Sequence, residues 1–164
     1  MKIQTLRTDD CIDEVIEKYS KTVYRLAFSI MKNKADADDV FQEVFLRYIE
    51  KNRSFESEEH RKAWLIKVTV NCCKKIYNSA ARKRTVSLYE AVEDGYLHKT
   101  DDLLELLDKL EPKYRSVIHL YYYEDMTTEE IAAVLDRKPS TVRSQLARAR
   151  QMLKEKLEGD GFNE

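Results

Sequence analysis

The stretch TTEEIAAVLDRKPSTVRSQLARAR, residues 127–150, says most about the fold of this chain. Thr127 and Glu130 have the spacing of a capping box, which predicts the start of a short helix. Residues 136–139 leave room only for a turn, and Ser140 is the expected N-cap of a second helix. The apolar stripe of that helix is Val142, Leu146, Ala149, Leu153 and Leu157. A short helix, a tight turn and a longer basic helix predict a helix-turn-helix.

The face opposite this apolar stripe has the composition of a DNA-reading surface. At about 100° per residue, it carries Ser140, Thr141, Ser144, Ala147, Arg148 and Gln151, with Arg143 and Arg150 at its border. Small side chains allow close approach to a groove, and hydroxyl groups and arginine bind phosphates and base edges. We therefore expect this helix to enter the major groove of DNA. The alternative is a purely structural helix pair of the same shape.

The distribution of charge supports contact with a polyanion. The formal net charge is only −1, yet residues 61–85 contain eight Lys or Arg and no acid. Residues 137–156 contain seven basic residues and one acid, whereas residues 86–136 contain four basic residues and thirteen acids. Two separate basic blocks in a nearly neutral protein indicate two contacts with one polyanion. The alternative for either block is the solvated face of a helix.

Apolar residues at helical spacing predict helices along the rest of the chain. The first, after Asp9 or Asp10 as a cap, has the stripe Ile12, Val15, Ile16, Tyr19, Val23, Leu26, Ala27 and Ile30. The second follows a break at Asn33 and has Ala37, Val40, Phe41, Val44, Phe45 and Tyr48. The third is expected to bury Trp64, Leu65, Val68, Cys72 and Ile76. A leucine-faced helix with Leu103, Leu106, Leu107 and Leu110 is expected to stop before Pro112, where another helix begins.

Residues 86–100 separate these helices into two groups. They contain Gly95 and several acids, and their apolar residues show no sustained helical spacing, which is typical of a linker. The sequence therefore predicts an all-α protein, with two small helical modules at residues 1–85 and 101–164 joined by a flexible acidic linker.

Other classes of protein are disfavoured by what the sequence lacks. It has three Gly and two Pro, and neither a P-loop nor a dinucleotide-binding motif. Its three Cys form no CxxC pair, and its three His lie in no metal-binding motif. We expect no catalytic residue, metal or cofactor. No apolar run approaches the roughly 20 residues of a membrane span, and the start lacks a signal peptide, so we expect a cytoplasmic protein with no membrane insertion.

Taken together, these motifs resemble the extracytoplasmic-function (ECF) group of the sigma-70 family of bacterial RNA polymerase sigma factors. DADDVFQEVFLR at residues 36–47 resembles region 2.2, and AWL at residues 63–65 with Asn71 resembles regions 2.3 and 2.4. The segment from LEPKYR at residues 110–115 through Arg150 resembles region 4. The chain departs from the family's usual pattern at Lys75, where Asp is common. It also departs at Asp136 and Arg137, where Gly and an apolar residue are frequent.

The resemblance implies specific roles for both modules. Region 2 would dock on the clamp helices of the polymerase β′ subunit through Asp36, Asp39, Gln42, Glu43 and Phe45. It would read and melt the minus-ten promoter element through Lys67, Asn71, Lys74, Lys75, Asn78 and Arg82. Phe55, in the irregular segment 53–60, would help to form a wall of its base pocket. Region 4 would bind the β flap and read the minus-thirty-five element through Ser140, Thr141, Arg143, Ser144, Ala147, Arg148 and Gln151.

The resemblance thus implies a sigma factor that directs promoter recognition for a stress or envelope-signal regulon, with an anti-sigma factor as a further partner. A second hypothesis is a helix-turn-helix regulator that does not form a holoenzyme. That hypothesis explains the second module but leaves the region 2.2 motif and the first basic block without a role. Binding to core polymerase without DNA distinguishes the two.

Overall fold

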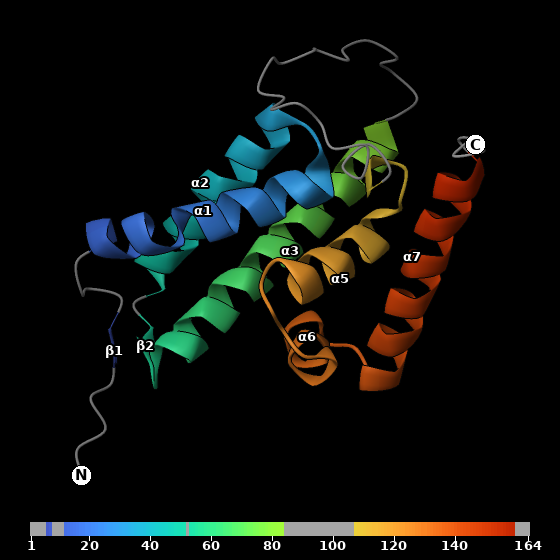
Figure 1. Cartoon of the computed structure of the whole chain (residues 1–164). Helices are drawn as coiled ribbons and strands as arrows, with labels where there is room; N and C mark the ends of the chain where they lie inside the picture. Colours follow the sequence, from blue (N-terminus) through green and yellow to red (C-terminus); the bar gives the residue numbers. More distant parts are fainter. Residues whose placement is uncertain (1–5, 8–11, 52, 84–106, 160–164) are drawn as a thin grey trace. The chain divides into compact units, whose positions relative to one another are not determined.

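The computed structural model of the chain describes residues 6–7, 12–51, 53–83 and 107–159. Apart from one short strand pair, the described chain is α-helical, and it divides into two compact units, Met1–Ser87 and Leu88–Glu164 (Figure 1). Asp9, Asp10, the linker at residues 86–100 and the leucines at 103 and 106 lie outside the described residues.

The first unit is built on three helices, α1 (Ile12–Met31), α2 (Lys34–Glu50) and α3 (Glu58–Lys83). The break between the first two falls where it was expected. Lys32 has a left-handed φ of 60°, which ends α1, and Asn33 then caps α2 by accepting the Asp36 N–H at 2.9 Å. The cap satisfies one of the donors that every helix start leaves free.

The core of this unit lies between the three helices, since each contacts the other two. On α1 the predicted stripe is buried except at its first turns, where Ile12 and Ile16 are half-buried. On α3 the buried face is broader than one stripe and includes Ile66, Val70 and Cys73, while Val68 and Ile76 are only half-buried. The difference arises because α3 packs against α1 and α2 at once.

A short antiparallel ribbon was not expected. In it, β1 (Leu6–Arg7) pairs with β2 (Ser54–Phe55), with Leu6 opposite Phe55. The segment at residues 53–60, predicted to be irregular, is thus partly a strand. Its pairing partner lies almost fifty residues earlier, so no local pattern could indicate it.

The second unit contains α5 (Pro112–Tyr122), α6 (Thr128–Leu135) and α7 (Pro139–Gly159), and both α6 and α5 pack on α7 (Figure 1). Pro112 lies in the first turn of α5, as predicted, since a missing N–H costs nothing there. Among the described helices, none combines the length and apolar character of a membrane span.

Candidate nucleic-acid interface

The helix-turn-helix is present in the second unit. Thr127 and Glu130 form the predicted capping box: the Thr127 Oγ1 accepts the Glu130 N–H at 3.2 Å, and the Glu130 carboxylate accepts the Thr127 N–H at 2.8 Å. After Leu135 the chain turns at Asp136, whose φ of 52° and ψ of 46° are left-handed. Aspartate tolerates this conformation better than most residues, so Asp136 can stand where glycine is frequent.

The start of the recognition helix differs from the prediction. The helix α7 begins at Pro139, and the Lys138 carbonyl accepts the N–H groups of Thr141 and Val142 at 2.9 and 3.1 Å. Ser140 therefore lies inside the first turn and is not the N-cap. Proline suits the first helical position because its ring fixes φ at a helical value.

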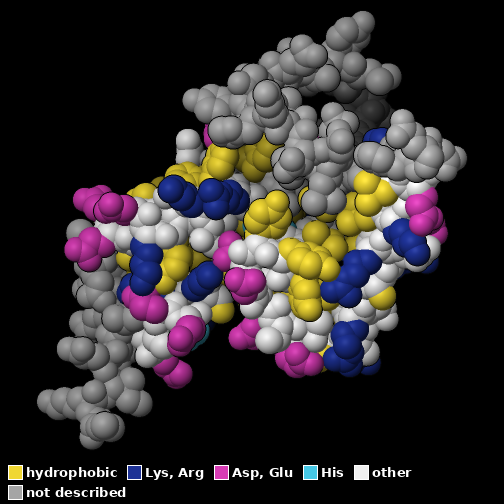
Figure 2. All heavy atoms as spheres, viewed as in Figure 1, with side chains coloured by type: hydrophobic (Ala, Val, Ile, Leu, Met, Phe, Trp, Pro, Cys, Tyr) yellow, Lys and Arg dark blue, Asp and Glu magenta, His cyan; other side chains and the backbone are white. Residues whose placement is uncertain are grey.

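All seven residues predicted to face DNA on α7 are exposed: Ser140, Thr141, Arg143, Ser144, Ala147, Arg148 and Gln151. The opposite side is buried at Val142, Leu146 and Ala149. The predicted apolar stripe weakens toward the end of the helix, where Leu157 is 40% exposed. Figure 2 shows Lys and Arg side chains gathered along this helix.

Part of this face is hollowed. Tyr114 of α5 and five α7 residues line an open hollow of about 320 Å³: Ser140, Thr141, Ser144, Gln145 and Arg148. Tyr114 and Gln145 were missed by the sequence analysis. Tyr114 belongs to another helix. Gln145 lies between the exposed and the buried side of α7, next to the buried Leu146.

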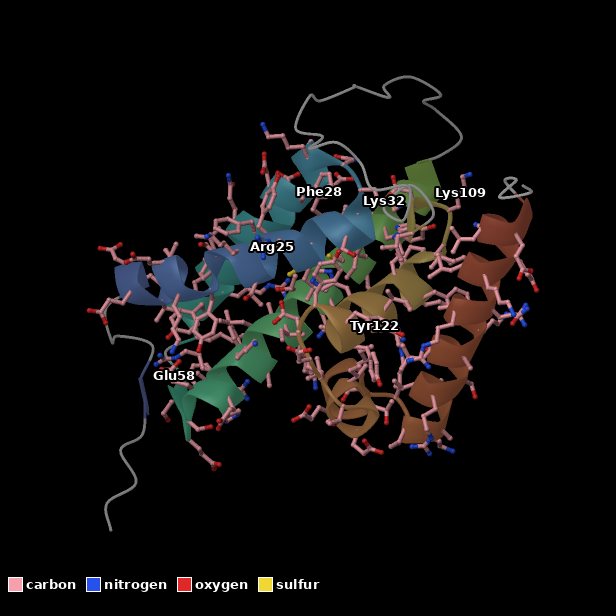
Figure 3. The ribbon with its side chains drawn as sticks, in the orientation of Figure 1. Arg25, Phe28, Lys32, Glu58, Lys109 and Tyr122 are labelled. Carbon is pink, nitrogen blue, oxygen red and sulfur yellow. The ribbon has the colours of Figure 1, made fainter. Side chains whose placement is uncertain are left out.

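Two arginines at the border of this face have protein partners. Arg143 reaches Glu129 of α6 at 3.4 Å, and both side chains are more than half exposed, so the ion pair adds little stability. Arg150 donates to the Tyr122 hydroxyl at 2.8 Å and lies over the rings of Tyr121 and Tyr122. Figure 3 marks Tyr122 near the end of α5. Arg150 thus links α5 to α7.

In the first unit, the basic face of α3 is partly exposed. Asn71, Lys74, Lys75 and Asn78 are exposed and Lys67 is half-buried. Their spacing places them along one side of the helix. The side chain of Arg82 lies outside the described side chains. The adjacent Cys72 and Cys73 are free and buried, and burial raises the pKa of Cys73 to about 12, so this thiol stays protonated at neutral pH.

Phe55, predicted to form part of the wall of a base pocket, is not exposed in the structure. Phe55 is fully buried, with its ring stacked on Tyr48 and edge-on to Trp64 at 6.0 and 5.8 Å between centroids. Trp64 is also buried, as its place in the apolar stripe indicated. Burial of an aromatic ring removes a large apolar area from water, so Phe55 stabilises this part of the core.

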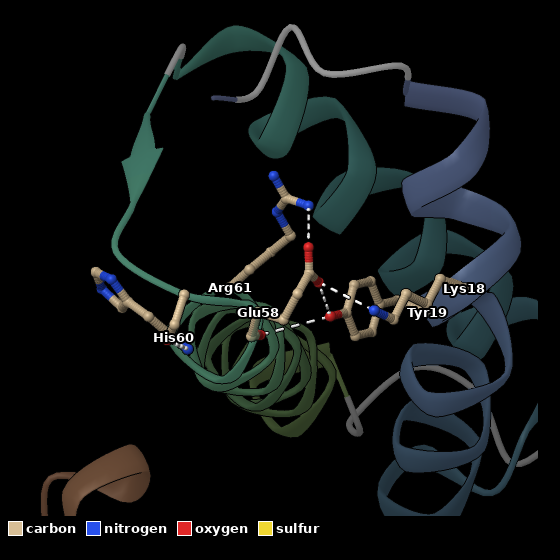
Figure 4. Close-up of polar contacts among 6 residues, drawn as sticks. Lys18, Tyr19, Glu58, His60 and Arg61 are labelled. Carbon is tan, nitrogen blue, oxygen red and sulfur yellow. Dashed lines mark hydrogen bonds and ion pairs between the residues drawn. The ribbon is translucent and has the colours of Figure 1, made fainter. Parts of the chain in front are cut away.

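A polar network holds the start of α3 against α1 (Figure 4). The Glu58 carboxylate accepts from the Tyr19 hydroxyl, from Lys18 at 3.3 Å and from Arg61 at 2.8 Å. The hydrogen bond from Tyr19 is the main cause that lowers the pKa of Glu58, and Arg61 and Lys18 act in the same direction. The Arg61 guanidinium also lies over the Phe55 ring at 5.6 Å. The network therefore fixes the segment between α2 and α3.

The predicted polymerase-binding residues on α2 have different environments. Asp39 and Gln42 are exposed, and Glu43 pairs with Arg47 at 2.7 Å. Asp36 accepts a hydrogen bond from the cap residue Asn33. Phe45 is only 5% exposed, and its ring packs at a tilt against Phe41 with 4.9 Å between centroids, so it contributes to the core of the free chain.

Two exposed apolar residues on α2 were missed. Leu46 and Ile49 are 51% and 54% exposed and continue the row of Asp39 and Gln42 at helical spacing. We call these four residues the α2 face. The sequence could have indicated Leu46 and Ile49, because both are apolar yet lie outside the predicted core stripe of this helix. Phe28 on α1, labelled in Figure 3, is likewise exposed. Its ring stacks on that of Tyr24.

The described residues include no group of three or more His, Cys, Asp or Glu placed to hold a metal ion.

Comparison with known proteins matches both units. Residues 15–83 match the family "Sigma-70 region 2", and residues 100–153 match "Sigma-70, region 4". The RNA polymerase sigma factor SigV of Bacillus subtilis is 31% identical over 87% of this chain and 88% of its own length. The ECF RNA polymerase sigma factor SigE of Mycolicibacterium smegmatis is 30% identical over 88% of this chain and 61% of its own length.

A solved structure has the same fold. The sigma factor RpoE from Bartonella quintana, in complex with the anti-sigma factor NepR, aligns with a TM-score of 0.75 and 23% identity. The alignment covers 91% of this chain and 98% of that protein.

Proposed function

The chain belongs to the sigma-70 family of RNA polymerase sigma factors, in its ECF group, and we propose how its two units divide promoter recognition. As a sigma factor it binds core RNA polymerase and directs transcription initiation at promoter DNA. In the proposal, the first unit docks on the β′ clamp helices and opens the minus-ten element. The second unit binds the β flap and reads the minus-thirty-five element.

The observation that carries this assignment is the exposed face of α7. Its side chains are small, hydroxyl-bearing or basic, while Val142, Leu146 and Ala149 anchor the opposite side. Small residues let a helix approach the floor of the major groove, and Arg148 and the hydroxyl groups can then reach bases and phosphates. The basic face of α3 supports a second DNA contact, on the minus-ten side.

The α2 face supports polymerase docking. Asp39 and Gln42 offer acceptors to a basic partner, and Leu46 and Ile49 add apolar surface beside them. Protein interfaces combine an apolar centre with polar groups in this way. We propose that the α2 face, rather than Phe45 or Asp36, meets the clamp helices.

We also propose an anti-sigma factor as a regulatory partner and the cytoplasm as the site of action. The RpoE relative is bound to an anti-sigma factor, which supports the same class of partner here. Core polymerase and promoter DNA are both found in the cytoplasm.

The test is reconstitution with purified core RNA polymerase. We expect the full chain to bind core polymerase without DNA and to start transcription from a subset of fragments of the source genome. A chain that binds DNA but not core polymerase would instead be a helix-turn-helix regulator.

A further inference from the structure

We propose that Arg137 determines which base Gln145 reads in promoter DNA, by occupying the amide oxygen of Gln145. Gln145 then presents chiefly its NH₂ group to the groove. The inference rests on the proposed function, because it requires α7 to lie in the major groove.

Arg137 lies in the turn before α7 and is half-buried. Its N–H bonds to the Ala132 carbonyl at 2.9 Å, which closes the end of α6 and directs the side chain. Burial lowers the pKa of the Arg137 guanidinium, and no carboxylate of the described chain contributes to this shift. The group nevertheless stays charged, since an arginine in a protein does not lose its proton. A charged donor is thus held beside the hollow on α7.

The partner of this donor is Gln145. Arg137 Nη1 donates to Gln145 Oε1 at 2.8 Å. A guanidinium has donors only, so the atom that faces it must be the amide oxygen and not the nitrogen. The planar amide then directs its NH₂ group away from Arg137. Gln145 lines the hollow with Ser144 and Arg148, so we expect this NH₂ group to be within reach of DNA bound at that face.

The hydrogen bond from Arg137 to the amide oxygen restricts which base Gln145 can recognise. Glutamine usually binds adenine through two hydrogen bonds: its oxygen accepts from N6–H, and its NH₂ group donates to N7. The amide oxygen keeps a second lone pair, but the bond from Arg137 holds it toward the turn, so we expect the NH₂ donor to make the contact with DNA. A donor matches the acceptors of guanine (O6 and N7) or thymine (O4) in the major groove. Arg137 is therefore a positioning residue that turns Gln145 from an adenine reader into a reader of acceptors.

The test is selection of a randomised DNA duplex library by holoenzyme assembled from core RNA polymerase and the full chain. Wild-type holoenzyme is expected to select guanine or thymine at one position of the upstream element. Arg137→Met frees the amide oxygen and keeps the side-chain volume, so preference at that position is expected to shift to adenine by at least about fivefold.

Two further variants keep the result interpretable. Gln145→Glu has the same shape but offers only acceptors, so it is expected to shift the same position to cytosine, whose N4 is a donor. Lys138→Met removes a neighbouring exposed charge and is the matched control. It is expected to change affinity for all sequences alike and to leave the base preference in place.

Each outcome has one meaning. If the Arg137→Met holoenzyme selects the wild-type base, or if Lys138→Met shifts the preference in the same way, the inference is overturned while the proposed function stands. If the wild-type holoenzyme enriches no sequence at all, the proposed function and the inference are both overturned.

Discussion

At the scale of single residues, the aromatic side chains of the first unit show how burial decides function. Phe45 and Phe55 both lie in motifs that the resemblance linked to binding, yet both are buried. Phe28 is 43% exposed although it lies between core positions of α1. A buried ring contributes to stability, and only an exposed one is available to a partner without rearrangement.

Replacement of Phe55 by alanine is expected to destabilise the first unit by about 3–5 kcal/mol, the usual cost of removing a buried phenylalanine. Trp64 is the only tryptophan and lies next to Phe55, so its fluorescence reports unfolding of this unit in urea. Phe28→Ala is the matched control and is expected to cost less than half as much. Equal losses from both variants would contradict the core assignment of Phe55.

The acidic end of the α2 face leads to a prediction about docking. Asp39→Lys is expected to weaken binding to core polymerase at least about fivefold, since it places a cation where a basic partner is expected. Glu17→Lys, an exposed charge reversal on α1, is the control. The measurement is titration of labelled chain with core polymerase, alongside circular dichroism to show that helicity is kept. Unchanged affinity of Asp39→Lys would remove Asp39 from the docking surface.

Glu58 makes the first unit sensitive to acid. Its pKa is lower in the folded state than in the unfolded chain, mainly because Tyr19 donates a hydrogen bond to it. Such a group stabilises the fold above its unfolded pKa, near 4.3, and this contribution is lost as pH falls through the lower folded value. Glu58→Gln is therefore expected to reduce stability at pH 7 and to make the decline between about pH 5 and 3 shallower.

The check is the free energy of unfolding by urea at several pH values, followed by Trp64 fluorescence. Glu59→Gln, an exposed neighbour, is the control. A pH profile of Glu58→Gln that parallels the wild type would show that another group causes the acid sensitivity.

At the scale of helices, the ends are determined by local chemistry. The capping box at Thr127 begins α6, and proline begins both α5 and α7. Ser140 shows the limit of this reasoning, because a serine after proline resembles a cap although the helix has already begun. The choice follows from the Lys138 carbonyl, which accepts two N–H groups of the first turn.

Thr127→Ala is expected to destabilise the second unit by about 1 kcal/mol, the usual cost of losing such a cap. Thr128→Ala, inside the helix, is the control and is expected to have little effect because alanine favours helices. Urea unfolding should be followed by circular dichroism and by Trp64 fluorescence together. Trp64 lies in the first unit, so its fluorescence transition is expected to stay in place while the circular dichroism transition shifts to lower urea. An equal shift of both transitions would show that the two units do not unfold separately.

At the scale of the whole molecule, the basic side chains are divided between two units that each have their own core. One basic face lies on α3 and the other on α7, each on a segment matched by a different sigma-70 region. In the proposed function, this arrangement lets one polymerase-bound chain contact two promoter elements.

We therefore expect a step-specific defect from the α3 face. The double variant Asn71→Ala and Lys75→Ala is expected to reduce promoter opening several-fold more than it reduces binding to core polymerase. Lys21→Ala, an exposed cation on α1, is the control. Permanganate footprinting of the melted strand measures the opening, and normal opening by the double variant would refute the site on α3.

Local sequence determined most of the helices, the helix-turn-helix and the exposed faces of α3 and α7. Helical periodicity and capping depend on residues within about four positions of each other, so they can be read directly. Motif order along the chain also indicated the family that the comparisons confirmed.

Tertiary structure alone decided the ribbon, the burial of Phe55 and the orientation of Gln145. The ribbon pairs Leu6 with Phe55, and the Phe55 ring is closed in by Tyr48 and Trp64 from two different helices. The Gln145 amide is set by Arg137 across the turn. Each depends on partners that only folding brings together, so no spacing in the sequence could reveal it.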